Sequence, residues 1–138
     1  MLLILLGCAP CESLTGYHEG SVLGDREGLV SLDVEMLGED HLDISGWWLP
    51  DDLPRTGEPN LVTTRGCNTS GPTVLDYTQT WFDRVRHETV EWTGQLTLLI
   101  DHEGVHGGWD MEVWRGPDEA TLTLEEELVG QWRAEPLE

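Results

Sequence analysis

Three cysteines are the first residues whose type and spacing suggest chemistry: Cys8, Cys11 and Cys67. Cys8-Ala9-Pro10-Cys11 has the C-x-x-C spacing of a dithiol redox centre, with a proline inside the motif. Such a centre needs its first thiol at the N-terminus of a helix, which activates it. Only a short apolar run precedes this motif and no helical pattern follows it, so a redox site is not the interpretation that we favour. A closed zinc site is not expected either, because no histidine lies at ligand spacing from the cysteines.

A second group of chemically active side chains lies in the segment DHEGVHGG and just after it: Asp101, His102, Glu103, His106 and Asp110. Oxygen and imidazole ligands at this density suit a divalent cation. The spacing matches no known metal motif, and hairpin turns are polar and rich in glycine for conformational reasons alone. We therefore expect an ordinary turn and no metal site, with Asp101, His102 and His106 as the ligands if a metal were held.

Seven tryptophans are many for a chain of 138 residues. Four of them fall on the apolar faces of the strands predicted below, which is typical of core residues: Trp48, Trp92, Trp109 and Trp132. Trp47 and Trp114 fall on the opposite, polar faces. An exposed indole can stack on a sugar ring, so these two residues are candidates for ligand binding. The alternatives for them are a second packed face or a subunit interface.

The sequence contains no nucleophile–base pair, phosphate-binding glycine loop or metalloprotease motif. Acidic residues are so abundant that some pair of carboxylates will always lie at the separation found in glycosidases. Such a pair is therefore no evidence for a glycosidase. Glu126 falls in phase with the apolar residues of its strand, so it is either a buried carboxylate or is turned outward by a bulge. The sequence predicts no enzyme and no cofactor; a hydrolase that uses acidic residues is the alternative.

The charge balance excludes one class of partner. The chain has 27 acidic and 7 basic residues, a formal net charge of −20. A surface with this charge repels polyphosphate, so we expect no binding of nucleic acid. Anionic lipid headgroups are an equally poor partner for the folded surface.

The elements that position these residues follow from a period of two in hydrophobicity. Residues 30–36 and 42–48 alternate apolar and polar side chains around the turn Gly38-Glu39-Asp40, which predicts an antiparallel hairpin. Residues 50–59 contain three prolines and form a loop. Further strands are predicted at the following ranges: 61–65, 73–85 (where a helical spacing competes), 89–101, 109–114 and 120–133. Gly94, on the apolar face of the clearest strand, indicates a bulge or a close backbone contact.

These patterns predict one all-β domain, an antiparallel β-sandwich or small meander barrel of about six or seven strands. The domain covers residues 28–134, and residues 135–138 form a solvated tail. Residues 8–27 are expected to be a flexible tether, because glycine recurs in this segment and little in it can pack.

The first residues, MLLILLGC, are apolar without alternation, as in a buried strand or a secretion signal. Leu5-Leu6-Gly7-Cys8 resembles the lipobox of bacterial lipoproteins. The resemblance implies that residues 1–7 are a signal removed by a dedicated peptidase, and that the Cys8 thiol carries a diacylglycerol. Because Ala9 is not the aspartate that retains such proteins at the inner membrane, the resemblance points to the outer membrane of a Gram-negative cell.

Lipidation of Cys8 would leave two thiols, Cys11 and Cys67. They can pair in an oxidising compartment, and the bridge would stabilise the domain by about 4 kcal/mol on the chain-entropy model. The alternative is two free thiols.

Together these expectations describe a lipid-anchored protein of the cell envelope with a binding or structural role. The membrane is its partner through Cys8, and a glycan or an envelope protein is its expected ligand. A carbohydrate-binding module that uses exposed tryptophans is the alternative function. The sequence predicts no oligomeric state.

Overall fold

The computed structural model describes residues 11–137, which form eight antiparallel strands and two short 3-10 helices. The elements in chain order are η1 (Cys11–Leu14), β1 (Gly16–Gly24), β2 (Gly28–Leu37), β3 (His41–Pro50), β4 (Leu61–Gly66), β5 (Thr73–Asp83), β6 (Glu88–Asp101), β7 (Gly104–Gly116), η2 (Glu119–Thr121) and β8 (Thr123–Pro136). Within this part of the chain, no helix is long and apolar enough to cross a membrane.

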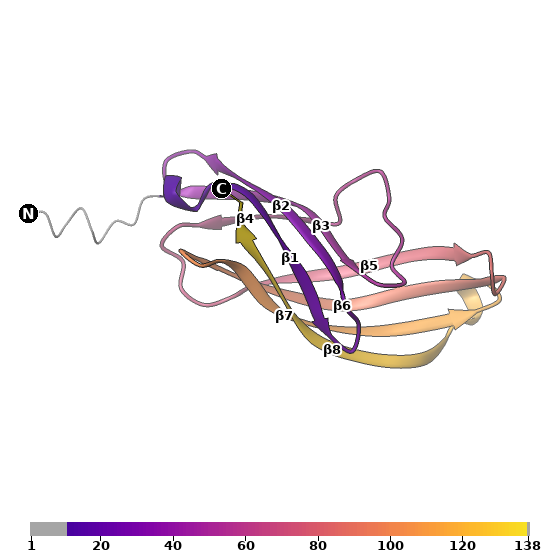
Figure 1. Cartoon of the computed structure of the whole chain (residues 1–138). Coiled ribbons are helices and arrows are strands. Elements are labelled where there is room, and N and C mark those ends of the chain that lie inside the picture. Colours follow the sequence, from indigo (N-terminus) through magenta and orange to yellow (C-terminus); the bar gives the residue numbers. More distant parts are fainter. Residues whose placement is uncertain (1–10, 138) are drawn as a thin grey trace, which may run out of the picture.

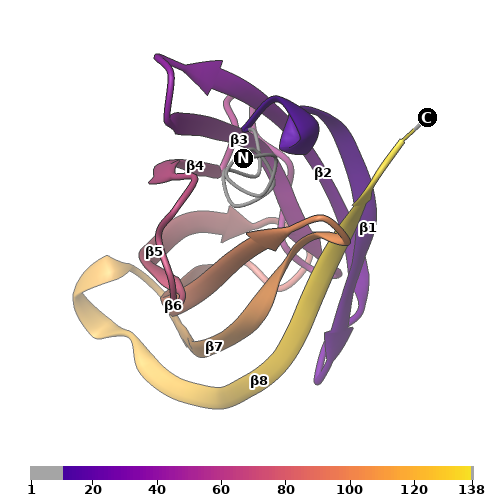
Figure 2. The same cartoon turned by 90° about the vertical axis from the view of Figure 1, so that its left-hand side faces the viewer.

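All eight strands belong to one sheet, in the order β4-β3-β2-β1-β8-β7-β6-β5. The order describes two four-stranded meanders, β1–β4 and β5–β8, which are joined where β1 pairs with β8. The sheet curls until it is nearly closed into a barrel, with β4 and β5 as its two edges (Figures 1 and 2). The predicted all-β, antiparallel class is confirmed, whereas the predicted number of strands is too low.

The additional strand is β1, which lies inside the segment expected to be a flexible tether. β1 pairs with both β2 and β8, and its inward residues His18 and Val22 are buried. The expectation for residues 16–24 was wrong because glycine there serves close packing: a Cβ on Gly20 would lie 1.8 Å from the carbonyl oxygen of Arg133. A strand whose inward positions are His, Gly and Val carries almost no periodic apolar signal.

The C-terminal boundary also differs from the expected one. β8 continues to Pro136, and Glu135 and Pro136 pair with Glu19 and His18 of β1. The backbone N–H of Leu137 donates to the carbonyl oxygen of Tyr17. Residues 135–137 are exposed, as predicted, but the backbone ladder to β1 extends the strand into them. Glu138 lies outside the described residues.

The predicted hairpin and the predicted strands at 61–65, 73–85 and 89–101 are confirmed. β2 and β3 pair with Val30 opposite Trp48 and Val34 opposite Ile44, so the apolar residues share the inner face. β5 is a strand from Thr73 to Asp83, which resolves the competition with a helix, and the last two residues of the predicted range belong to the turn that follows. Gly94 is a close backbone contact: a Cβ there would lie 2.0 Å from the carbonyl oxygen of Asp110 on β7.

The core fills the inside of the curved sheet. The four tryptophans predicted to be core residues are all buried, together with aliphatic residues from every strand except β5, whose buried residue is Tyr77. Trp48 packs edge-on against Tyr77 and Trp109, with ring centroids 5.6 and 5.5 Å away. Burial raises the pKa of the Tyr77 hydroxyl to about 12, and this hydroxyl donates to Gln79 Oε1 over 2.6 Å.

Side chains bridge the seam where β4 and β5 do not pair. Arg65 of β4 is only 5% exposed, and it donates to Thr73 Oγ1 of β5 and to the carbonyl oxygen of Leu98 on β6. Its other terminal nitrogen donates to the carbonyl oxygens of Thr69 and Gly71, in the loop between β4 and β5. The guanidinium therefore joins both edges of the sheet and the loop that connects them.

Asn60 makes a second connection across the seam. Its side chain exchanges two hydrogen bonds with the backbone of Trp48, and its amide nitrogen also lies 3.4 Å from the Tyr77 hydroxyl oxygen. The loop before Asn60 contributes buried Leu53 to the core. The loop predicted at residues 50–59 thus covers one end of the seam.

A disulfide joins Cys11 to Cys67, with the two Cα atoms 5.7 Å apart. It ties η1, at the start of the described chain, to the loop between β4 and β5. Cys11 is buried, and Cys67 packs against the core. The chain is therefore held to the domain from Cys11 onward.

His18 makes stability depend on pH. The side chain is 1% exposed, its Nδ1 contacts the carbonyl oxygen of Gly16, and burial lowers its pKa below the usual value. Below about pH 6.5 the unfolded chain therefore binds a proton that the folded chain does not bind, and stability decreases as the pH falls.

We expect this histidine to contribute a loss of at most about 1.4 kcal/mol per pH unit between pH 6.5 and its folded pKa. Urea unfolding of wild type and His18→Gln at pH 7.5, 6.5 and 5.5 measures that contribution. His87→Gln, at an exposed turn, is the control. Equal pH slopes for wild type and His18→Gln would contradict the prediction.

Candidate functional site

Trp47 is part of an aromatic and apolar surface on the outside of β1–β4, which we call the Trp47 face. It consists of Tyr17, Leu29, Ser31, Trp47 and Val62. Ser31 is the direct ladder partner of Trp47, and its hydroxyl hydrogen-bonds to the hydroxyl of Tyr17. Tyr17 is 45% exposed and Leu29 is 70% exposed. The period of two places all five residues outward, because their neighbours in each strand point into the core.

Arg55, from the loop between β3 and β4, covers part of this face. Its guanidinium carbon lies 4.4 Å from the centroid of the Trp47 ring. Arg55 itself is exposed. A cation–π contact at such a site contributes only about 0.5–1 kcal/mol, so a ligand can displace the arginine from the ring.

Trp114 lies elsewhere. It is on the outside of β7, opposite Glu91 of β6, and its indole N–H donates to Glu112 Oε1 over 3.2 Å. The two tryptophans that the sequence marks as ligand candidates therefore belong to different halves of the sheet and do not form one site.

An open groove of about 680 Å³ crosses the outer face of β1, β8, β7 and β6. Its lining includes the glycine pair Gly107–Gly108, with Leu23, Leu99, Gln131 and Arg133 around it. Gly107 permits a close approach between strands, since a Cβ there would lie 1.7 Å from the carbonyl oxygen of Thr97. Neither Trp47 nor Trp114 lines this groove.

A second hollow, of about 530 Å³, lies over Gly94 on the outside of β5–β8. Four carboxylates line it: Asp76, Asp110, Glu112 and Glu127. Glu112 and Glu127 are direct ladder partners, an arrangement of like charges that is unfavourable in a sheet. This hollow is where the alternative hypothesis of a hydrolase would place its acidic residues.

The segment with the metal candidates is only partly a turn: Asp101 ends β6, His102 and Glu103 form the turn, and His106 and Asp110 lie within β7. His106 Nε2 lies 3.3 Å from Asp101 Oδ2, and His102 Nε2 lies 3.8 Å from Glu103 Oε2. Asp101 also accepts from the backbone N–H of Glu103, which shapes the turn. Among residues 11–137, no group of three or more His, Cys, Asp or Glu side chains has the arrangement of a metal site.

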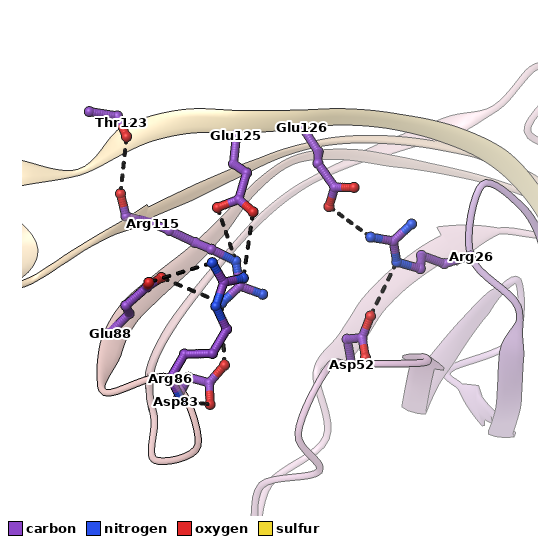
Figure 3. A network of polar contacts seen from close by, with 9 residues as sticks. All are labelled: Arg26, Asp52, Asp83, Arg86, Glu88, Arg115, Thr123, Glu125 and Glu126. Atoms are coloured by element: carbon purple, nitrogen blue, oxygen red, sulfur yellow. Dashed lines mark hydrogen bonds and ion pairs between the residues drawn. The ribbon is translucent and has the colours of Figure 1, made fainter.

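At the end of the sheet opposite the β6–β7 turn, arginines form a network of ion pairs with neighbouring Asp and Glu side chains (Figure 3). Arg115 of β7 lies 3.3 Å from both Asp83 Oδ2 and Glu125 Oε2, and Arg86 contacts Glu88 and Glu125. The backbone N–H groups of Arg86 and Val85 lower the pKa of the Asp83 carboxyl, with Arg115 acting in the same direction and burial against it. The network fastens the β5–β6 hairpin to β7 and β8.

Glu126 belongs to a separate part of this network. The ladder between β7 and β8 shifts by one residue between the pairs Val113–Glu126 and Trp114–Leu124. The bulge therefore lies beyond Glu126 and leaves this residue in phase with the inward residues of β8. Glu126 is 39% exposed and lies 2.7 Å from Arg26 Nη2, while Arg26 also contacts Asp52. Neither alternative for Glu126 holds in full: the bulge does not turn the residue outward, and its carboxylate is partly exposed and paired with Arg26 instead of buried.

Sequence reasoning missed Tyr17, Arg55 and Arg65. Tyr17 was hidden in the supposed tether. Arg55 reaches Trp47 because of the conformation of its loop, and Arg65 reaches the seam because the sheet nearly closes. Neither feature produces a periodic signal in the sequence. Cys8 lies outside the described residues.

Comparison with protein-family models, with curated protein sequences and with solved structures gives no match.

Proposed function

We propose that the protein is a binding domain of the cell envelope, anchored by a lipid on Cys8, and that the Trp47 face binds a neutral sugar chain. The observation that carries the binding part is the pair of outward aromatic rings, Tyr17 and Trp47, on either side of the Ser31 hydroxyl. No specific partner beyond this chemical class follows from the residues.

The chemistry of the Trp47 face suits a sugar. A pyranose ring has one apolar face, which stacks on an indole, and a rim of hydroxyl groups that need hydrogen-bond partners. Ser31 and Tyr17 supply hydroxyls, and Asp33, the ladder partner of Tyr17, supplies a carboxylate on the same side of the sheet. A neutral sugar also avoids the repulsion that the net charge of −20 imposes on anionic ligands.

Two facts support the envelope part of the proposal. Leu5-Leu6-Gly7-Cys8 resembles a lipobox, and the disulfide between Cys11 and Cys67 uses the other two of the three cysteines. Disulfides persist in oxidising compartments, which include the bacterial periplasm and cell surface. Intact-mass analysis of the chain made in a lipoprotein-producing bacterium tests this part: retention of Met1, or an unmodified Cys8, would refute it.

Replacing Trp47 by Ala should weaken the binding of a neutral oligosaccharide at least tenfold, since a central aromatic residue in a binding site commonly contributes more than about 1.4 kcal/mol. Isothermal titration with glycans selected on an array measures the effect. Trp114→Ala is the matched control, because Trp114 is also an outer-face indole but lies on the other half of the sheet. Equal losses for both variants, or no glycan bound by the wild type, would contradict the proposal.

The variant Arg55→Ala provides a second test of glycan binding at the Trp47 face. Removal of the guanidinium uncovers the Trp47 ring, so glycan affinity should stay equal or rise up to about fivefold. A tenfold loss would instead indicate that the ligand binds Arg55 rather than the ring.

A further inference from the structure

We propose that one particular end of the barrel rests on a zwitterionic bilayer surface, a proposal that depends on the lipid anchor at Cys8 proposed above. We call it the Cys11 end. It comprises η1, the turn at residues 38–40, the loop at residues 67–72, the turn at residues 102–103 and the end of β8.

The sheet topology brings these segments together. Cys11 is bonded to Cys67, and the backbone N–H of Cys67 donates to the carbonyl oxygen of Asp40. β5 begins beside the last residues of β6, and β8 ends beside the start of β1. In Figure 1 η1, the end of β8, the β2–β3 turn and the β6–β7 turn lie at the same end of the molecule.

The length of chain between the anchor and the disulfide determines which end faces the lipid. Two residues, Ala9 and Pro10, separate Cys8 from Cys11, so three Cα-to-Cα steps join them, each of at most about 3.6 Å in a fully extended chain. The Cα of Cys11 can therefore lie no more than about 11 Å from the Cα of a lipidated Cys8. The strands are much longer than this: β6 has 14 residues, which correspond to roughly 45 Å. The far end of the barrel cannot reach the bilayer unless the barrel lies on its side.

The surface chemistry of the Cys11 end favours a neutral membrane surface. Exposed apolar side chains surround this end, from β2, the start of β5 and the last described residue: Met36, Leu37, Val74 and Leu137. They suit shallow contact with headgroups and the upper acyl region. The turns between them carry the exposed acids Glu39, Asp40 and Glu103, which repel anionic lipid.

This orientation has a consequence for the proposed ligand site. Trp47 lies in the half of β3 away from the Cys11 end, and its ring points out from the side of the barrel. Trp47 is therefore kept clear of the membrane and remains open to a sugar chain, whereas Tyr17, whose carbonyl oxygen accepts from the backbone N–H of Leu137, lies near the Cys11 end.

Energy transfer from the protein to a membrane dye tests the proposal. A fluorescent amino acid replaces either Glu39, at the Cys11 end, or Arg84, at the far β5–β6 turn. The full oxidised chain is coupled through Cys8 to a maleimide lipid in phosphatidylcholine vesicles that carry an acceptor on the headgroups. We expect several-fold higher transfer from position 39 than from position 84. Equal transfer from the two positions would overturn the proposal.

The control is an insertion of about a dozen Gly and Ser residues after Pro10, which allows the domain to move out by roughly 20 Å. The difference between the two positions should then decrease, and an unchanged difference would contradict the short link as its cause. Because the lipid is attached chemically, a failed orientation result is distinguishable from a failed lipidation result, which intact-mass analysis of the cellular protein reports separately.

Discussion

Arg65→Met should lower the free energy of unfolding by about 3 kcal/mol. Arg65 supplies four hydrogen bonds at the seam between β4 and β5, and no carboxylate within residues 11–137 pairs with it. The loss of a donor to a buried acceptor costs about 1–3 kcal/mol, and the carbonyl oxygen of Leu98 is such an acceptor. The three other acceptors are partly buried, so water replaces the arginine there at a lower cost.

Chemical denaturation monitored by tryptophan fluorescence measures this effect. Arg133→Met is the matched control, because the Arg133 side chain is exposed and makes no hydrogen bond or ion pair with residues 11–137. We expect that control to change stability by less than about 0.5 kcal/mol. Arg65→Lys keeps the charge but cannot reach all four acceptors, and should lie between wild type and Arg65→Met. Equal stability of Arg65→Met and Arg133→Met would refute a role of Arg65 in closing the sheet.

Reduction of the disulfide between Cys11 and Cys67 should destabilise the domain by about 4 kcal/mol. The two cysteines are 56 positions apart, so the bridge shortens a long loop in the unfolded chain. The disulfide also fixes the loop at residues 67–72 to η1, and Arg65 is hydrogen-bonded to the same loop. The oxidised protein should therefore need clearly more denaturant to unfold than the reduced protein.

Urea unfolding with and without a reductant makes the comparison. The double variant Cys11→Ser/Cys67→Ser controls for effects of the reductant itself: it should unfold at the same concentration in both buffers. A wild-type midpoint that does not respond to reductant would contradict the prediction. Since Arg65 and Cys67 contact the same loop, the effects of their substitutions should not add.

The period of two was sufficient to predict most strands but not β1. β2, β3 and β6 carry apolar residues at most inward positions, with Gly46 and Gly94 as single interruptions, and all three strands were predicted. β1 has His18, Gly20 and Val22 at its inward positions, which resemble a loop in composition. Gly20 is required there by the backbone of Arg133, more than a hundred residues away in the sequence. A contact of that range leaves no local pattern.

The candidate ligand-binding residues were likewise predictable in part from local patterns and in part only from the tertiary structure. That Trp47 and Trp114 point outward followed from their phase within a strand. The surroundings of the two tryptophans depend instead on the order of strands in the sheet. This order places Tyr17 and Arg55 beside Trp47, and it places Trp114 apart from them on β7. Strand order is decided by pairings between distant segments, which a pattern within one segment does not encode.

By itself the sequence determined an acidic, all-β, antiparallel domain with a core rich in tryptophan, because alternation and composition act within each strand. Only the tertiary structure decided the eighth strand, the closure of the sheet through Arg65, and the end of the barrel from which the chain leaves at Cys11. Each of these depends on which distant backbones and side chains meet, and that is determined by the free energy of the whole fold rather than by local preference.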